Sequence, residues 1–258
     1  MDLTRIGEAL QTYVRPQTYP VAVGMVSRVE DIPEKARMPK RDAGRTMALC
    51  QGVALARRHG WVVAMGLDDM LCPLGALTVG FVAAKNRFLD GSFPIPFWVK
   101  DQSVRARMAK AIPQLEVGKY THVLLAPLHR AEFEPDVIIV YGDPAQVARL
   151  IQAAAYETGE PVTSVSVGGF ACGGEITVPM LTGACQYIMT GGGDRAIAQT
   201  QDHEAAFAMP AAKANSIAEG LEGTHKAGMR YPTPALLPFG AGLPPSFDEL
   251  MEYLKQSD

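Results

Sequence analysis

The sequence lacks long apolar runs and lacks a strong excess of charge. No stretch approaches the roughly 20 consecutive apolar residues that a membrane-spanning helix needs, and the acidic, amphipathic start is unlike a signal peptide. We therefore expect a cytoplasmic protein without a membrane partner. The formal net charge of −3 over 258 residues gives no electrostatic reason to expect nucleic acid as a partner.

Cysteine is scarce, and metal-binding spacings are absent. The four cysteines stand at positions 50, 72, 172 and 185 and form no Cys-x-x-Cys pair, and no two of the five histidines have His-x-x-x-His spacing. A structural zinc site is disfavoured because it uses closely spaced ligand pairs. In a reducing compartment the cysteines are thiols, metal ligands or catalytic groups rather than a disulfide framework.

What the chain does contain is typical of a globular α/β (or α+β) protein. A hydrophobic content of 48% and 25 glycines fit a loop-rich fold with a sizeable core. Apolar residues at helical spacing predict helices at residues 3–14, 46–58, 102–112, 145–156, 210–221 and 246–255. Short apolar or alternating runs predict strands at residues 20–26, 61–65, 121–126, 136–141, 162–167, 187–190 and 205–209.

A faint internal repeat predicts two similar α/β halves with a mixed sheet. The interval from Gln51 to Cys72 and that from Gln152 to Cys172 both run helix, glycine, strand, turn, cysteine, short helix. We expect a first half at residues 1–135, a second at 136–223 and a proline-rich arm with a short helix at 224–258, within one structural domain. The alternative is that strand–turn–helix units look alike without a duplication.

Cysteines at helix starts are the first candidate site. Cys72 precedes Pro73, a residue suited to a first helical turn, and Cys172 lies in a glycine-rich turn. A helix N-terminus favours thiolate, the form that binds metals. Convergence of Cys50, Cys72 and Cys172 between the halves, with Cys185 as a further candidate, would suit an iron–sulfur cluster or another soft metal centre. The alternative is that each cysteine packs as a small hydrophobe.

A glycine-rich segment is the second candidate site. Gly191, Gly192, Gly193, Asp194 and Arg195 follow a predicted strand and are expected to form a loop. Backbone amides and a guanidinium could hold a small anionic ligand or cofactor there. A turn closed by an Asp–Arg pair is the other interpretation. The Gly-x-Gly-x-x-Gly pattern of dinucleotide-binding folds is missing.

Several short motifs together resemble a known family. They are Pro20-Val21-Ala22-Val23, Cys50-Gln51-Gly52, Asp69 with Cys72-Pro73, the run from Phe133 to Ile139, Cys172 and Gly193-Asp194-Arg195. From about residue 5 to residue 223 the chain resembles the domain of unknown function 169 family, also called ArCR. The resemblance implies metal or iron–sulfur binding by cysteines. The family often has a cysteine just before Gly-Asp-Arg, where this chain has Gly191 and Gly192, which leaves three or four candidate ligands.

Three functional hypotheses follow. The first is a protein that binds an iron–sulfur cluster or related metal cofactor through cysteines, with a redox role as one use of it. The alternative is a non-catalytic module that binds a small anionic ligand and has structural cysteines. A weaker one is thiol catalysis by Cys172, for which no base is evident. The proline-rich arm at residues 230–245 could also wrap a second subunit, so a homo-oligomer is a further expectation.

Overall fold

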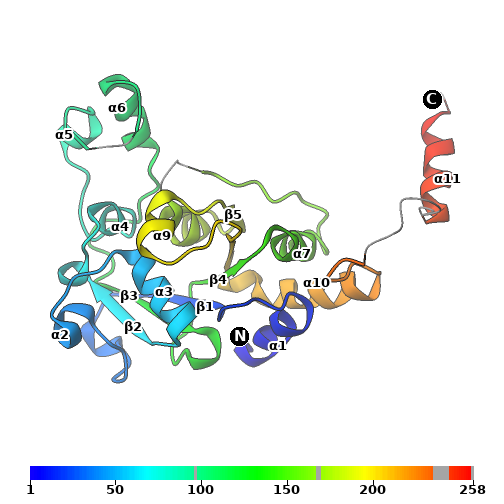
Figure 1. Ribbon diagram of the computed structural model, residues 1–258, viewed down its shortest axis with the longest axis horizontal. Helices are drawn as coiled ribbons and strands as arrows, with labels where there is room; N and C mark the ends of the chain where they lie inside the picture. The colour runs from blue at the N-terminus through cyan, green and yellow to red at the C-terminus, as the bar shows by residue number, and fades with distance from the viewer. Residues whose placement is uncertain (96–97, 167–169, 235–243, 257–258) are drawn as a thin grey trace.

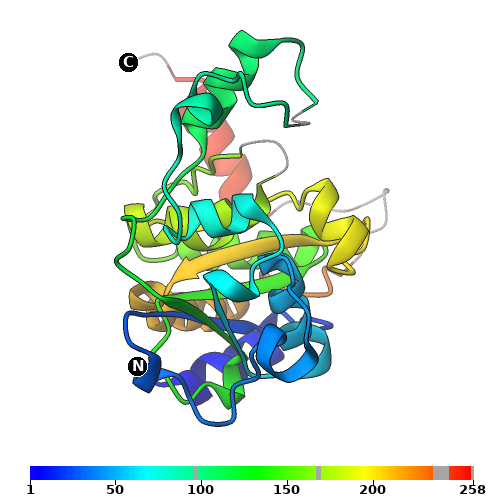
Figure 2. The same cartoon turned by 90° about the vertical axis from the view of Figure 1, so that its left-hand side faces the viewer.

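The protein is built around one six-stranded antiparallel sheet. A computed structural model describes residues 1–95, 98–166, 170–234 and 244–256. The strands are β1 (Val21–Val26), β2 (Val63–Gly66), β3 (His122–Pro127), β4 (Val137–Gly142), β5 (Gln186–Ile188) and β6 (Ala205–Pro210), in the order β2-β3-β1-β4-β6-β5. Helices lie above and below the sheet (Figures 1 and 2). The predicted α/β class is therefore confirmed.

The helices follow the apolar periodicity of the sequence. They are α1 (Leu3–Tyr13), α2 (Pro39–Ala43), α3 (Leu49–His59), α4 (Pro73–Thr78), α5 (Asn86–Leu89), α6 (Gln102–Ala111), α7 (Pro144–Ala154), α8 (Val178–Thr182), α9 (Gly192–Ile197), α10 (Ala214–Lys226) and α11 (Pro245–Leu254). A π-helical segment, η4 (Gly173–Thr177), precedes α8. No helix among the described residues is long and apolar enough to cross a membrane.

The prediction of a mixed sheet is wrong. Every strand pair in the described part of the chain is antiparallel. A helix between two strands suggests a parallel crossover, but the connection through α3 leads from β1 past β3 to an edge of the sheet. There β2 pairs antiparallel with β3, through Val63 opposite Leu125.

The sheet is arranged symmetrically about its central pair, β1 and β4. Ala22 lies opposite Ile138 at the centre, and a strand ending in proline lies outside each central strand, β3 with Pro127 and β6 with Pro210. The predicted duplication of the sequence stays a prediction. The sheet runs across the expected boundary at residues 135 and 136, since β1 pairs with β4.

The two faces of the sheet carry separate apolar cores. On one face α3, η4 and the strands pack around side chains such as Val53, Met65 and Ile176. On the other, α1, α7 and α10 pack around Leu10, Leu150 and others. Gly52 brings α3 close to the sheet, since a Cβ there would lie 2.8 Å from Leu125 Cδ1.

Two local predictions are corrected by the structure. Residues 162–166 form no strand, and residue 167, the last of the predicted strand, lies outside the described residues. The side chains of residues 162–166 alternate in polarity, but such an alternation also occurs in irregular segments. The edge position beside β6 is occupied by β5 instead. The expected loop at residues 191–195 is largely the first turn of α9, because the Asp194 carboxylate accepts a hydrogen bond from the Gly191 N–H at 3.1 Å and caps the helix.

Candidate functional site

Three cysteines lie at the starts of helical segments on one face of the sheet. Cys50 is the second residue of α3, Cys72 is the N-cap of α4, and Cys172 directly precedes η4. Helix α3 contacts α4 and α9, and α4 contacts η4. Gly75 permits part of this approach, because a Cβ there would lie 3.2 Å from Leu49 Cβ. The three positions are therefore drawn together by helix packing.

The thiols interact with one another electrostatically. Burial raises the pKa of Cys172 well above its usual range, and the charges of Asp194, Cys50, Glu175 and Cys72 raise it further. Burial likewise raises the pKa of Cys50 to about 12, with contributions from Asp194, Glu175 and Cys72. Cys50 and Cys72 thus raise the pKa of Cys172, and Cys72 also raises that of Cys50. The carboxylates of Asp194 and Glu175 act on the thiols of both Cys50 and Cys172. The convergence of the three cysteines on one metal centre stays a prediction.

Glu175 is the first of these carboxylates, and a hydrogen bond is formed by one of its two oxygens. Its side chain is fully buried, and Oε1 accepts a hydrogen bond from the Tyr141 hydroxyl at 2.6 Å, whereas Oε2 has no hydrogen-bond partner within the described part of the chain. Burial and then the charge of Asp194 raise the pKa of Glu175 to about 8. Glu175 lies within the π-helical segment, a conformation often found at functional sites.

Asp194 is the second carboxylate, and a matched residue shows what is unusual about it. Asp69 has the same local turn after β2: Oδ2 accepts from the Gly66 N–H at 3.0 Å and Oδ1 from the Lys40 N–H at 2.9 Å. Asp194 Oδ2 accepts a hydrogen bond from the Gly191 N–H, but its Oδ1 is buried and has no hydrogen-bond partner in the residues that the structure describes. Burial raises the pKa of Asp194. Helix capping accounts for the hydrogen bond to Asp194 Oδ2. It gives no role to Asp194 Oδ1.

The positive charge of Arg57 acts on both Glu175 and Asp194, but a third carboxylate already binds this guanidinium. Its buried guanidinium donates to both oxygens of Glu204, at 2.8 and 3.0 Å, and lies 3.9 Å from the centroid of the Tyr141 ring. Arg58 adds a bond of 2.8 Å to Glu204. Despite opposing desolvation, these bonds and charges leave the pKa of Glu204 lowered to about 2. Arg57 is therefore only partly available to offset the charge of Glu175 and Asp194.

The fourth cysteine does not join the others. Cys185 is buried in the core on the opposite face of the sheet, with residues of α7 and α10. Burial raises its pKa. In addition, no group of three or more His, Cys, Asp or Glu side chains within the described residues is placed so that it could hold a single metal ion.

In the predicted anion site, the Gly191 N–H and the Arg195 guanidinium already bind groups of the protein itself. The Gly191 N–H is bound by Asp194, and the Arg195 guanidinium bonds to the carbonyl oxygens of Gln201 and Glu204. Gly192 and Gly193 are exposed, on a helix of six residues. Of this segment, Asp194 is the residue that faces the thiols electrostatically. The two predicted sites thus share one carboxylate.

Sequence reasoning did not select Glu175, Tyr141 or Arg57 as site residues. A signal for Glu175 was present, because it is a lone charge in the apolar run from Phe170 to Leu181. In the sequence, Tyr141 is the last residue of a predicted strand. Arg57 is a cation in the last turn of a predicted helix, where a positive charge is common. Only the three-dimensional pairing of β4, α3 and η4 identifies these two.

Comparison with known proteins now places the chain. The family described as uncharacterised ArCR, DUF169, matches residues 9–220. The chain belongs to the DUF169 family. It is also similar to the uncharacterized protein MJ0308 of Methanocaldococcus jannaschii, with 26% identity over 211 residues, covering 78% of this chain and 86% of that protein. No solved structure matches the chain significantly. The expected family is thereby confirmed, and α11 lies outside the matched residues.

Proposed function

We propose that this DUF169 protein binds an iron–sulfur cluster or a related multinuclear metal cofactor through Cys50, Cys72 and Cys172. One observation carries the proposal: Glu175 Oε2 and Asp194 Oδ1 are buried carboxylate oxygens without a hydrogen-bond partner among the described residues, and the charges of these two carboxylates act on the thiols of Cys50 and Cys172. A buried polar atom without a partner is costly, and native proteins retain few of them. A bound cation is the partner that carboxylates and thiols have in common.

The donor set fits a multinuclear cofactor better than a single ion. Ligands of one ion must all approach the same point, and the described donors are not placed to do so. The cysteines of an iron–sulfur cluster bind different iron atoms and lie further apart. Three thiols leave one iron without a cysteine, and Glu175 or Asp194 is the nearest candidate for that position.

Electrostatics also favour a cationic occupant. The site contains five side chains that can become negatively charged, namely three thiols and two carboxylates. Such a site is neutral only while these groups hold their protons, as the raised pKa values of Cys50 and Glu175 indicate. Metal cations would replace those protons and favour the thiolates. When bound, a cluster of this kind supplies redox or Lewis-acid chemistry.

The test is anaerobic purification followed by iron and acid-labile sulfide analysis and a visible spectrum. We expect iron and sulfide in stoichiometric amounts, and a visible spectrum with the broad absorption that iron–sulfur clusters show. Single Cys→Ser variants at positions 50, 72 and 172 should lose most of the iron. Cys185→Ser is the matched control, because Cys185 lies in the opposite core, and it should keep wild-type iron content.

Two results would reject the proposal. One is a colourless, metal-free protein after anaerobic purification and after reconstitution with iron and sulfide. The other is equal iron loss in Cys185→Ser and Cys172→Ser, which would trace the loss to misfolding rather than to missing ligands. The alternative of an anion-binding module is less well supported, since the Gly191 and Arg195 donors are already engaged.

A further inference from the structure

Helix α11 has an apolar face that no other described residue covers. Phe247, Leu250, Met251 and Leu254 follow the i, i+3, i+4, i+7 spacing of a helix that docks into a groove. Each of the four side chains is more than half exposed, from 51% for Leu250 to 67% for Leu254. Monomeric proteins rarely leave such apolar surfaces in water. The helix therefore needs a partner surface.

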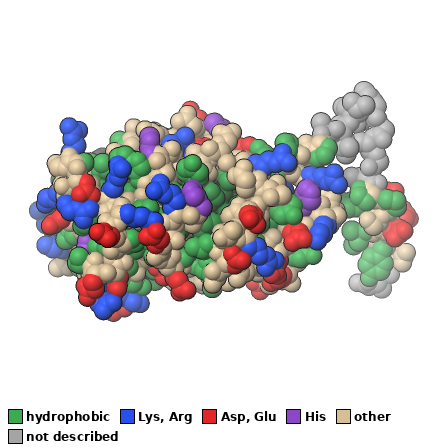
Figure 3. Space-filling view, turned by 90° about the horizontal axis from the view of Figure 1, so that it is seen from below, with side chains coloured by type: hydrophobic (Ala, Val, Ile, Leu, Met, Phe, Trp, Pro, Cys, Tyr) green, Lys and Arg blue, Asp and Glu red, His purple; other side chains and the backbone are tan. Residues whose placement is uncertain are grey.

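The remaining faces of α11 are acidic. Asp248, Glu249 and Glu252 lie within the helix, and Lys255 at its end is paired with Glu252. Figure 3 shows hydrophobic and acidic side chains together on this helix, which stands apart from the body. A complementary surface would be apolar at its centre and positively charged at its rim.

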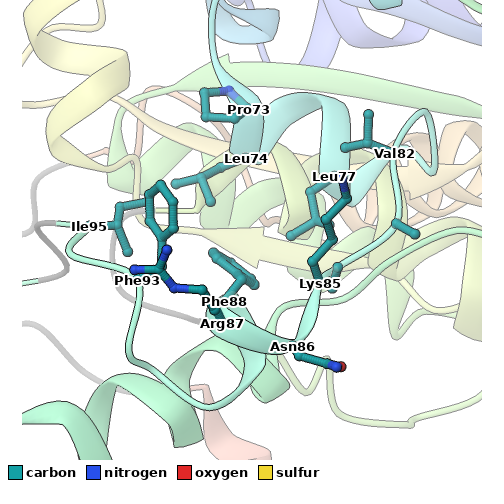
Figure 4. A pocket seen from close by; sticks show the side chains of 12 residues that line it. Pro73, Leu74, Leu77, Val82, Lys85, Asn86, Arg87, Phe88, Phe93 and Ile95 are labelled. Carbon is teal, nitrogen blue, oxygen red and sulfur yellow. The ribbon is translucent and has the colours of Figure 1, made fainter.

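One cavity on the body has this character. It encloses about 750 Å³ and is lined mainly by apolar side chains, including Leu74, Leu77, Phe93 and Ile95 (Figure 4). It lies between α4 and α5, and one of its lining residues is an exposed aromatic side chain, Phe93, which is 49% exposed. Exposed aromatic side chains next to an apolar groove are typical of protein interfaces.

The rim of this cavity is basic. Lys85 and Arg87 line it, are exposed, and form no ion pair of 4 Å or less with any described residue. The segment from residue 85 to residue 110 holds six lysines and arginines against two aspartates, in a chain whose net charge is −3. The groove therefore carries the charge opposite to that of α11.

We propose that α11 of a second copy of this chain docks its apolar face into the cavity between α4 and α5. A second copy is favoured because α11 and the α4–α5 region lie at opposite ends of the long axis of the molecule (Figure 1). Asp248, Glu249 and Glu252 then face Lys85 and Arg87. The docking does not depend on the cofactor, because it uses surfaces that do not include the thiols.

Sedimentation velocity over a range of protein concentrations, with hydrogen exchange of residues 245–254, tests this docking. The full-length protein should self-associate, and α11 should become protected as concentration rises. Leu250→Asp/Leu254→Asp should abolish both effects. Lys85→Glu/Arg87→Glu should weaken association by about tenfold or more, while Arg45→Glu, a reversal of an exposed cation between α2 and α3, should not.

Charge exchange distinguishes direct contact from misfolding. Glu249→Lys/Glu252→Lys should weaken association alone and restore it in combination with Lys85→Glu/Arg87→Glu. A monomer at every concentration with rapidly exchanging α11 would overturn the proposal. Concentration-independent protection of α11 in a monomer would also overturn it, because the helix would then occupy a surface of its own chain. Association that survives Leu250→Asp/Leu254→Asp would place the interface elsewhere.

Discussion

The hydroxyl of Tyr141 donates a hydrogen bond of 2.6 Å to Glu175 Oε1, and both side chains are buried. The bond joins β4 of the sheet to the π-helical segment that follows Cys172. Burial raises the pKa of Tyr141 well above its usual range, so the hydroxyl keeps its proton and remains the donor. The other oxygen of Glu175 has no hydrogen-bond donor among the residues described.

Glu175 makes the cofactor-free protein less stable as the pH rises. Its pKa is raised from 4.5 in a model peptide to about 8 in the fold, so the native state binds more protons than the unfolded state between these values. The free energy of unfolding should therefore fall between about pH 4.5 and pH 8, by a few kcal/mol in total. The raised pKa of Asp194 adds a contribution of the same sign.

Urea unfolding of metal-free wild type and Glu175→Gln at several pH values between 5 and 8.5 checks this expectation. The glutamine variant should show a much shallower decline, because it has no proton to lose. Glu157→Gln, at an exposed glutamate, is the control and should follow the wild type. Parallel curves for wild type and Glu175→Gln would contradict the assignment.

The thiols of Cys50 and Cys172 should react slowly in the folded, metal-free protein. The thiolate is the reactive form, and burial together with neighbouring acids raises the pKa of both groups. Alkylation by iodoacetamide, followed residue by residue by mass spectrometry, should accelerate up to pH 9.5 without reaching a plateau. A plateau below pH 8 at Cys172 would instead favour the thiol-catalysis hypothesis.

Arg57 should be among the residues whose loss costs the most stability. Its side chain is 1% exposed and bonds to both oxygens of Glu204, so Arg57→Met leaves a buried carboxylate poorly paired. We expect a loss of about 3–5 kcal/mol in the free energy of unfolding. Arg58→Met should cost less, because Arg58 is 23% exposed at its side chain and makes a single bond to Glu204.

A double variant separates charge pairing from packing at this position. If the cost of Arg57→Met comes from unpaired Glu204, then Glu204→Gln in the same chain should recover part of the stability. Chemical denaturation of the two single variants and the double variant measures the coupling. Purely additive effects would show that Arg57 acts through its contact with the Tyr141 ring instead.

Much of the fold could be predicted from local patterns, because periodicity records which face of an element is buried. The predicted helix at residues 46–58 is α3 (Leu49–His59), and the predicted strand at 136–141 is β4 (Val137–Gly142). Strand direction is different, since it depends on where connections such as α3 lead the chain. The prediction of a mixed sheet was wrong because this information is non-local.

The candidate site was predictable in part for the same reason. Pro73 and the glycines around Cys172 indicate turns and helix starts, which are local features. The position of Cys185 could not be read in this way, because the register of β5 against β6 decides which face its neighbourhood joins. Glu175 and Arg57 are paired across 34 and 147 residues with Tyr141 and Glu204, beyond the reach of any spacing rule.

Gly220 on α10 provides a variant that should lower stability without touching the thiols. A Cβ at this position would overlap the carbonyl oxygen of Ala153 and lie 2.9 Å from its carbonyl carbon. These are backbone atoms, so α10 must move away from α7, and the strain should outweigh the higher helix propensity of alanine. We expect Gly220→Ala to lower the free energy of unfolding by about 1–3 kcal/mol.

The matched control is Gly7→Ala on α1, where a Cβ would meet nothing within 4 Å, so stability should rise by about 0.5–1 kcal/mol. Urea unfolding measures both changes. Because α10 packs on the face opposite Cys50, Cys72 and Cys172, the iron content per folded molecule should be the same in Gly220→Ala as in wild type. Loss of iron in this variant at full folding would mean that the two faces are coupled through the sheet.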